Sequence, residues 1–312
     1  MRVLFIDSVH AHLEQRLTAA GWVCEHDYTS TYARICEVLP SYDGMVIRSR
    51  IPVDRNLLEA ATTLKFVARS GAGLENIDLE AAAELGIEVF SSPEGNRDAV
   101  GEQCVGMLLM VLNHLKRADA EVRQGLWRRE ANRGRELGSL TVGLIGYGNM
   151  GSAFAEKLRG FGCRVVAYDK YRAPHPADEA ENLNLPDLQA VADVISLHLP
   201  ETEETRHFVN DEFLAACAKP IVLINTARGI HVDTAALVRG LESGAVAGAC
   251  LDVLEFERRS FEGLSSSDLP PAFQALLRYD QVILSPHIAG WTHESYIKLS
   301  SVLADKLLAR FA

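Results

Sequence analysis

Arg228, Glu257 and His287 each follow an apolar, strand-like run in the last third of the 312-residue chain. The three runs are IVLINTARG, GACLDVLEFE and VILSPHIAG. A guanidinium can hold a carboxylate through two parallel hydrogen bonds. An imidazole can exchange a hydroxyl proton near neutral pH, and a carboxylate beside it can orient the ring and stabilise its charged form. Together, these residue types could bind the carboxylate of a hydroxy acid and exchange its hydroxyl proton.

A glycine turn upstream indicates a dinucleotide site. The strand-like run TVGLI leads into GYGNMG, which carries Gly146, Gly148 and Gly151, and a helical segment follows. The next strand-like run, RVVAY, ends just before Asp169. In this order the glycines allow a tight turn, close approach of a pyrophosphate and close helix packing. Asp169 would accept hydrogen bonds from the ribose hydroxyls and repel a 2′-phosphate, which favours NAD over NADP.

Composition narrows the class of partner and the compartment. The net charge of −11 argues against nucleic acid or an anionic membrane surface as a partner. The chain begins with a strand-like run and has no apolar stretch of membrane-spanning length. Its 6 cysteines form no CxxC pair and read as small buried side chains in a reducing compartment, so we expect a cytoplasmic protein. No cluster has metal-ligand spacing, and we expect no metal site.

The elements that must position these residues alternate between strand and helix in two regions. This alternation predicts an α/β fold with two doubly wound parallel-sheet domains. In the first region we expect strands at 2–7, 22–28, 44–49, 65–70 and 87–92. In the second we expect six strands, at 141–145, 164–168, 192–199, 220–226, 246–253 and 281–286.

The order of the segments predicts an inserted domain. The last helical segment, 294–311, would return to the first region, so a substrate domain would comprise 1–97 and 287–312. The NAD-binding domain, 98–286, would lie between the two crossings, which would form a hinge over a cleft. The strongly apolar segment 97–123 predicts one long helix buried against a second domain or subunit, and hence a homodimer.

With these pieces in place, the sequence resembles the D-isomer-specific 2-hydroxyacid dehydrogenases, and among them the D-3-phosphoglycerate dehydrogenases. The matching motifs, in the family's order, are VARSGAGLENID, NRDAVGEQ, ELGSLTVGLIGYGNMG, SLHLPETEET, INTARG, LDVLEFE and SPHIAG. The resemblance implies a Rossmann NAD-binding domain inserted into a flavodoxin-like substrate domain. It also implies hydride transfer between NAD(H) and a D-2-hydroxy acid or 2-keto acid. The expected substrate pair is D-3-phosphoglycerate and 3-phosphohydroxypyruvate, as in serine biosynthesis, handled by a short form without a C-terminal regulatory domain.

The resemblance also implies roles for individual residues. Arg228 would hold the substrate carboxylate and carbonyl, His287 would be the acid/base, and Glu257 its partner. The expected substrate contacts on the first domain are Arg48, Arg69 and the backbone amides of Gly71, Ala72 and Gly73. The expected cofactor contacts are Gly146, Gly148, Asn149, Met150, Gly151, Asp169, His198, Leu199, Pro200, Thr205, Thr226, Ala227, Asp252 and Gly290.

Several alternatives stay open from the sequence. The family's glutamate is usually followed by proline, whereas Arg258 follows Glu257 here, and Glu255 stands two positions earlier. A slipped loop would therefore make Glu255 the partner of His287. The substrate could instead be that of a glyoxylate or hydroxypyruvate reductase or of a D-lactate-type enzyme. Arg48 and Arg69 supply one cation more than a small monoacid needs, which favours a phosphorylated substrate. A non-catalytic, NAD-dependent corepressor is the alternative from another class, and the intact acid/base pair argues against it.

Overall fold

The structure, a computed structural model that describes residues 1–171, 180–257 and 269–312, divides into two compact α/β units. Unit 1 contains Met1–Arg97 and Trp291–Ala312, and unit 2 contains Asp98–Gly290. The second crossing thus differs from the expected one, since residues 287–290 lie in unit 2. The reason is that Asp252 of unit 2 binds the backbone N–H groups of His287, Ile288 and Ala289.

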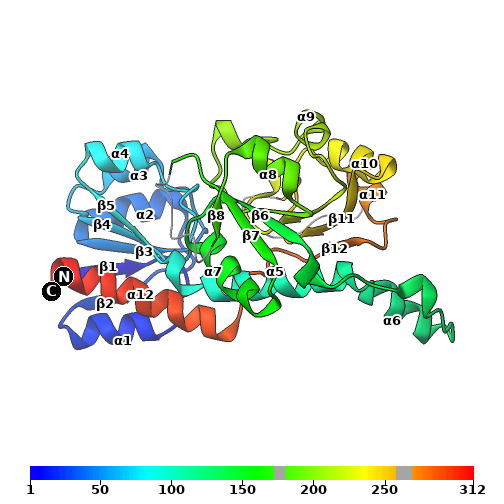
Figure 1. Ribbon diagram of the computed structural model, residues 1–312. Coiled ribbons are helices and arrows are strands. Elements are labelled where there is room, and N and C mark those ends of the chain that lie inside the picture. Colours follow the sequence, from blue (N-terminus) through cyan, green and yellow to red (C-terminus); the bar gives the residue numbers. More distant parts are fainter. Residues whose placement is uncertain (172–179, 258–268) are drawn as a thin grey trace. The chain divides into compact units, whose positions relative to one another are not determined.

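Unit 1 is built on a five-stranded parallel sheet with the order β2-β1-β3-β4-β5, which is the flavodoxin-like order. Its strands are β1 (Arg2–Phe5), β2 (Val23–His26), β3 (Gly44–Ile47), β4 (Phe66–Arg69) and β5 (Glu88–Ser91). Its helices are α1 (His12–Ala19), α2 (Tyr32–Val38), α3 (Arg55–Ala60), α4 (Leu79–Glu84) and α12 (His293–Phe311). Figure 1 shows helices on both faces of this sheet.

The alternation of side chains along β1 explains why both faces are covered. Leu4 belongs to a core cluster with α2, α3 and α4, whereas Val3 and Phe5 belong to a second cluster with α1 and α12. Successive side chains of a strand point to opposite faces, so an apolar run of this kind needs helices on both sides. The C-terminal helix α12 supplies Leu303 and Leu307 to the second cluster, which makes the last segment of the chain part of unit 1.

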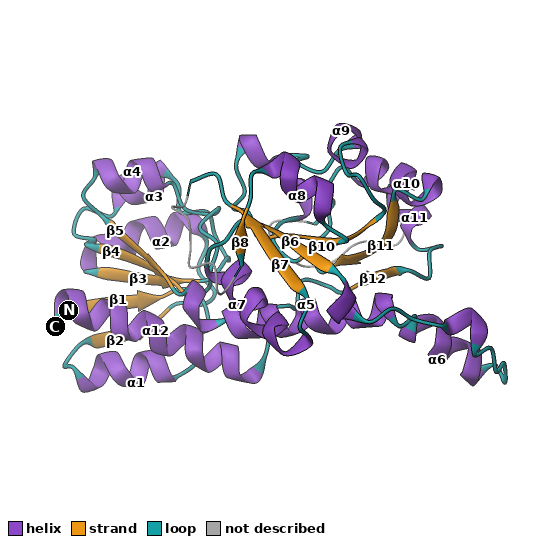
Figure 2. Ribbon diagram, in the orientation of Figure 1, coloured by secondary structure: helices purple, strands orange, loops and turns teal. Residues whose placement is uncertain are grey.

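Unit 2 is built on a seven-stranded parallel sheet with the order β12-β11-β10-β9-β6-β7-β8 (Figure 2). Its strands are β6 (Thr141–Ile145), β7 (Arg164–Tyr168), β8 (Glu181–Asn182), β9 (Val194–Leu197), β10 (Ile221–Asn225), β11 (Val246–Leu251) and β12 (Val282–Leu284). The order reverses between β6 and β9, which is where α/β folds of this kind bind a dinucleotide. The expected fold class, two parallel-sheet α/β domains, is therefore confirmed.

The expected number of strands in unit 2 is wrong. Six strands were expected, but the structure adds β8, whose two residues pair with Val166 and Ala167 of β7. Two exposed polar residues give no apolar pattern, so sequence periodicity cannot reveal such a strand. The third strand of the Rossmann order is therefore β8, and β12 extends the sheet by a seventh strand.

Two helical layers enclose the sheet of unit 2. One layer contributes to a core cluster with Leu144 of β6, and the other to a cluster with Ile145 of the same strand. The first layer consists of α5 (Arg97–Leu112) and α7 (Asn149–Leu158). The second consists of α8 (Leu185–Val191), α9 (Asp211–Ala215), α10 (Thr234–Ser243) and α11 (Pro271–Leu276). Helices thus shield both faces of the sheet from water, as is typical of parallel sheets.

The expected single helix over 97–123 is wrong, because the chain breaks it in two. Helix α5 ends at Leu112, and α6 (Leu115–Arg123) begins after His114, which has a left-handed backbone with φ of 52°. The Arg135 N–H donates a hydrogen bond to the carbonyl of Leu112, so the loop that follows α6 caps the C-terminal end of α5. Helix α5 packs in the core of its own unit, whereas α6 has no buried residue.

Candidate active site

The glycine turn after β6 has the backbone that a dinucleotide site needs. Gly146 has φ of +91°, and a Cβ there would lie 2.4 Å from the carbonyl oxygen of His198. A Cβ on Gly151 would lie 2.3 Å from the Gly146 oxygen, whereas a Cβ on Gly148 would meet nothing within 4 Å. The first and third glycines are thus required for the turn itself. Gly148 stands at the N-cap of α7, where a pyrophosphate can approach the amides of the first helical turn, Asn149 to Gly151.

Asp169 lies directly after β7 and joins this strand to the glycine turn. Its Oδ2 accepts a hydrogen bond from the Tyr147 N–H at 2.8 Å, and its Oδ1 accepts one from the Tyr171 N–H at 3.0 Å. These bonds fix the carboxylate at the carboxyl edge of the sheet, beside the place of the adenosine ribose in a Rossmann fold. The glycine turn and this acid together fit NAD.

The segment after β9 carries His198 and the turn that follows it. The His198 Nε2 lies 3.0 Å from the Ser196 hydroxyl, and burial lowers the pKa of His198 to about 4, so its ring is neutral at pH 7. The Thr205 hydroxyl donates to the carbonyl of Pro200 at 2.7 Å and thereby closes the turn. Thr205 thus shapes this segment, which also includes Leu199.

Arg228 stands on a turn organised by a residue that the sequence did not single out. Asn225, at the end of β10, is fully buried. Its Oδ1 accepts from the Ala227 N–H at 3.1 Å, and its Nδ2 donates to the Arg228 carbonyl at 2.8 Å. The Arg228 Nη1 donates to the Ala227 carbonyl at 2.6 Å. Thr226 faces α5, since its hydroxyl lies 3.4 Å from the Cys104 sulfur.

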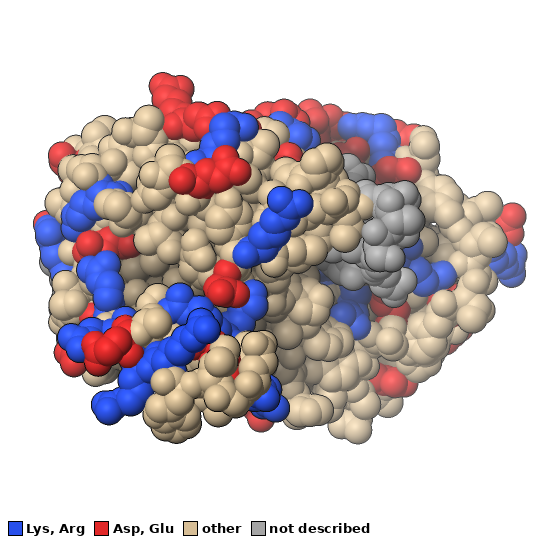
Figure 3. Space-filling model, turned by 90° about the vertical axis from the view of Figure 1, so that its right-hand side faces the viewer, with Lys and Arg blue, Asp and Glu red and all other residues tan. Residues whose placement is uncertain are grey.

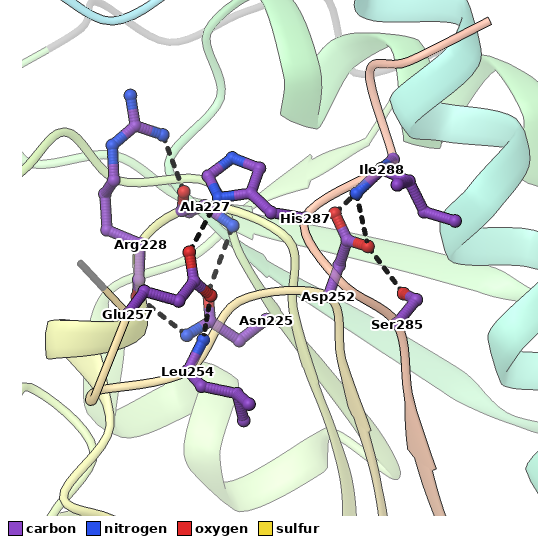
Figure 4. Close-up of polar contacts among 10 residues, drawn as sticks. Asn225, Ala227, Arg228, Asp252, Leu254, Glu257, Ser285, His287 and Ile288 are labelled. Atoms are coloured by element: carbon purple, nitrogen blue, oxygen red, sulfur yellow. Dashed lines mark hydrogen bonds and ion pairs between the residues drawn. The ribbon is translucent and has the colours of Figure 1, made fainter. Parts of the chain in front are cut away.

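Glu257 and His287 meet in unit 2. The His287 Nδ1 lies 2.8 Å from the Glu257 Oε2, and the two side chains are 25% and 22% exposed. The second oxygen of Glu257 accepts from the Leu254 N–H. Figure 4 shows that Arg228, Glu257 and His287 come from three separate segments and lie together, with the guanidinium and the imidazole above the carboxylate in this view.

The alternative partner of His287 lies elsewhere. The Glu255 carboxylate contacts the His207 Nε2 at 2.7 Å and accepts from the Thr234 N–H and hydroxyl. The geometry therefore pairs Glu257, and not Glu255, with His287. Arg258, which replaces the family's proline, lies outside the described residues.

Asp252 anchors the segment that carries His287. It is 1% exposed, and its carboxylate accepts from the Ser285 hydroxyl, from Ile288 N–H at 3.0 Å and from Ala289 N–H at 2.8 Å. Its carbonyl accepts from the His287 N–H at 2.7 Å. His287 has a left-handed backbone with φ of 55°, a conformation that costs a non-glycine residue about 1 kcal/mol or more. These bonds hold it there, ahead of Gly290 at the end of unit 2. Sequence reasoning placed Asp252 at the carboxamide and missed both this anchoring role and Ser285.

Unit 1 brings two of its expected substrate contacts together. Ile47 of β3 is in register with Arg69 of β4, so Arg48 and Arg69 stand at the carboxyl ends of neighbouring strands. The Arg69 Nε donates to the Arg48 carbonyl at 3.3 Å, and the Arg48 guanidinium carbon lies 4.5 Å from the centroid of the Trp291 ring. A Cβ on Gly71 would lie 2.1 Å from the Arg69 Nη1, so the loop of Gly71, Ala72 and Gly73 runs close to that guanidinium.

Some classes of site and partner find no support in the described residues. In this part of the chain no group of three or more His, Cys, Asp or Glu side chains could hold a metal ion. None of its helices combines the length and apolarity that crossing a bilayer demands. On the face seen in Figure 3, basic and acidic side chains are interspersed.

Comparison with known proteins decides the family. Residues 105–289 match the family described as D-isomer specific 2-hydroxyacid dehydrogenase, NAD binding domain. The chain belongs to the D-isomer specific 2-hydroxyacid dehydrogenases. The dehydrogenase is therefore an NAD-dependent enzyme, as its glycine turn and Asp169 indicate, and the resemblance stated from sequence motifs is confirmed.

Relatives of the dehydrogenase carry two different names. It is 36% identical to a hydroxypyruvate reductase of Thermotoga maritima over 276 residues, which are 88% of this chain and 86% of that protein. It is 35% identical to a D-3-phosphoglycerate dehydrogenase of Mycobacterium leprae over 288 residues, 92% of this chain but only 52% of that protein. The chain thus spans about half the length of the latter.

Solved structures agree on the fold of the dehydrogenase. The structure of a D-2-hydroxyisocaproate dehydrogenase matches with a TM-score of 0.84 and 27% identity, covering 100% of this chain and 96% of the other. Since the relatives differ in name, the comparisons establish the class of reaction and leave its substrate to be argued.

Proposed function

We propose that Arg228, Glu257 and His287 carry out the reaction on D-2-hydroxy acids. The contact between His287 Nδ1 and Glu257 is the observation that carries this proposal. With Nδ1 engaged, Nε2 is the ring nitrogen that would exchange a proton with the substrate oxygen. Glu257 would stabilise the imidazolium formed in oxidation, as a carboxylate does for a catalytic histidine. Arg228 would hold the substrate carboxylate.

The residues of the chain would act as follows. In oxidation, neutral His287 takes the proton of the substrate hydroxyl, and in reduction the imidazolium returns it to the carbonyl oxygen. Bound NAD supplies the hydride acceptor in oxidation, and its reduced form supplies the donor. Gly146, Gly148 and Gly151 would hold the pyrophosphate, and Asp169 the adenosine ribose.

We further propose D-3-phosphoglycerate and 3-phosphohydroxypyruvate as the substrate pair. The support is the pairing of Arg48 and Arg69 at the ends of β3 and β4 beside the amides of residues 71–73. Arg48 lies over the Trp291 ring, a contact that orients a guanidinium. A substrate with a carboxylate and a phosphate needs more than one cation, and arginine binds both groups with two parallel bonds.

Hydroxypyruvate is the alternative keto acid, favoured by the Thermotoga maritima relative, of which this chain covers 86%. Comparing kcat/KM for 3-phosphohydroxypyruvate, hydroxypyruvate and glyoxylate decides between them. We expect the phosphorylated acid to be preferred, and Arg48→Gln to lower its kcat/KM about ten- to hundredfold while changing that for hydroxypyruvate less than threefold, because a charged hydrogen bond contributes about 1.5–3 kcal/mol. Equal effects on both acids would refute the phosphate role of Arg48.

We also propose that the protein is a homodimer through the helical region 97–123, of which α6 is the exposed part. Helix α6 exposes Leu115 and Val122, and Trp127 after it is 79% exposed. Exposed aromatic and aliphatic side chains of this size are typical of interfaces. Sedimentation at micromolar concentration should give a dimer for the wild type and a shift toward monomer for Trp127→Asp. A wild-type monomer would contradict the proposal.

A cytoplasmic location is proposed on the state of the cysteines. All six are free thiols in the structure, and two of them, Cys104 and Cys250, are buried. Proteins of reducing compartments have this character. Fractionation of the source cells, with the protein followed by antibody, would test it.

A further inference from the structure

The turn that carries Glu257 also carries a second, separately held carboxylate. Glu255 is 18% exposed, and its Oε1 lies 2.7 Å from the His207 Nε2. Its Oε2 accepts from the Thr234 hydroxyl at 2.8 Å and from the Thr234 N–H at 3.1 Å. Both oxygens are thus engaged, and neither contact involves Arg228, Glu257 or His287. The proposed reaction assigns no role to the cluster of Glu255, His207 and Thr234.

The partners of Glu255 belong to segments that flank Arg228. Thr234 begins α10, so its N–H is at the positive end of the helix dipole, which favours a carboxylate. His207 has a left-handed backbone with φ of 46°, and its N–H donates to the Ile230 carbonyl at 2.8 Å. Glu255 therefore links its own turn directly to the start of α10, through Thr234, and indirectly to the stretch between Arg228 and α10, through His207.

The turn is packed on that same stretch without a gap. A Cβ on Gly229 would lie 2.0 Å from the carbonyl carbon of Leu254 and 2.5 Å from the Glu255 nitrogen. The residue after Arg228 thus touches the backbone of the turn. Only a glycine allows this approach, because any side chain would push the turn outward.

Two hydrogen bonds within the turn join Leu254 to Glu257. The Glu257 N–H donates to the Leu254 carbonyl at 3.0 Å, and the Leu254 N–H donates back to the Glu257 carboxylate. Because Glu255 lies between these two residues, a shift of its side-chain anchor displaces the Glu257 carboxylate as well. That carboxylate must stay within hydrogen-bond distance of His287 Nδ1.

We propose that Glu255 is a positioning residue, which fixes residues 254–257 against the Arg228 segment so that Glu257 meets His287. Its side chain contacts His207 and Thr234, and it would act through Glu257. The inference rests on the roles of Glu257 and His287 given under the proposed function. It predicts that Glu255 matters for turnover only while Glu257 is present.

A double-mutant cycle of Glu255→Ala and Glu257→Gln tests this. Alone, Glu255→Ala should lower kcat about ten- to hundredfold, with the Kd for NAD changed less than about twofold. In the Glu257→Gln background the same substitution should lower kcat less than about threefold. Glu255→Gln, which keeps an acceptor for Thr234, should recover part of the loss.

The matched control is Glu242→Ala, an exposed glutamate on α10, which should retain wild-type kcat. If Glu255→Ala proves unstable, His207→Asn replaces it in the cycle, since asparagine tolerates the left-handed backbone. Equal losses in both backgrounds would overturn the positioning role alone. Wild-type turnover by Glu257→Gln would overturn the proposed roles of Glu257 and His287, and this inference with them.

Discussion

Replacing Asp252 with alanine should both destabilise the protein and disturb catalysis. The carboxylate is 1% exposed and accepts from two backbone N–H groups, those of Ile288 and Ala289, and from the Ser285 hydroxyl. A buried donor left without an acceptor costs about 1–3 kcal/mol, and the Ser285 hydroxyl can rotate to another acceptor. Since entering water can satisfy part of the need, we expect the free energy of unfolding to fall by about 2–4 kcal/mol.

The same change should affect turnover, because these bonds hold His287 at φ of 55°. Urea denaturation of the wild type, Asp252→Ala and Asp252→Asn gives the free energies of unfolding, and steady-state kinetics gives kcat. Asparagine keeps one acceptor oxygen, so its loss should be about half that of alanine. If Asp252→Ala lowered the free energy of unfolding by less than about 0.5 kcal/mol and left kcat unchanged, the anchoring role would be refuted.

Two further predictions concern the cofactor segment. Burial lowers the pKa of His198 to about 4 from 6.5. As the pH falls, the imidazole is therefore protonated in the unfolded chain before it is protonated in the folded one, and the free energy of unfolding decreases from about pH 6.5 toward pH 4. Between about pH 7.5 and pH 5, the wild type should lose about 2 kcal/mol more unfolding free energy than His198→Asn, measured by urea denaturation. Asp169→Ala should raise kcat/KM with NADP relative to NAD at least about tenfold, and an unchanged ratio would rule out repulsion of the 2′-phosphate by this carboxylate.

Much of the fold could be predicted because its signals are local. The apolar runs that form β1, β3, β6 and β10 alternate along the chain with segments of helical periodicity. Such runs are typical of parallel sheets, whose strands are buried on both faces. The break after α5 was not predicted, because neither Asn113 nor His114 breaks a helix as strongly as glycine or proline does. The helix ends at the left-handed backbone of His114, and the Arg135 N–H, distant in sequence, donates to the carbonyl of Leu112. The apolar content of segment 97–123 also could not show whether its helix is buried in its own unit or against a partner subunit.

The site, like the fold, could be predicted from the sequence only in part. Arg228, Glu257 and His287 were predictable because each follows a strand of one parallel sheet, whose carboxyl ends share an edge. The residues that hold them were not. Asn225 and Ser285 are ordinary polar residues near strand ends. The role of Asn225 comes from its full burial beneath the turn of Ala227 and Arg228, and that of Ser285 from its bond to Asp252, 33 residues away. The register of the turn at Glu257 likewise depends on Gly229, which only the packed structure places beneath it.

The central claim, that His287 exchanges the substrate proton, is tested most directly by His287→Asn. Asparagine tolerates the left-handed backbone of this position, so the variant removes the imidazole and keeps the local fold. Steady-state oxidation of the preferred D-2-hydroxy acid should show kcat at least about a hundredfold below wild type, while the Kd for NAD changes less than about twofold. A kcat within about threefold of wild type would contradict the account.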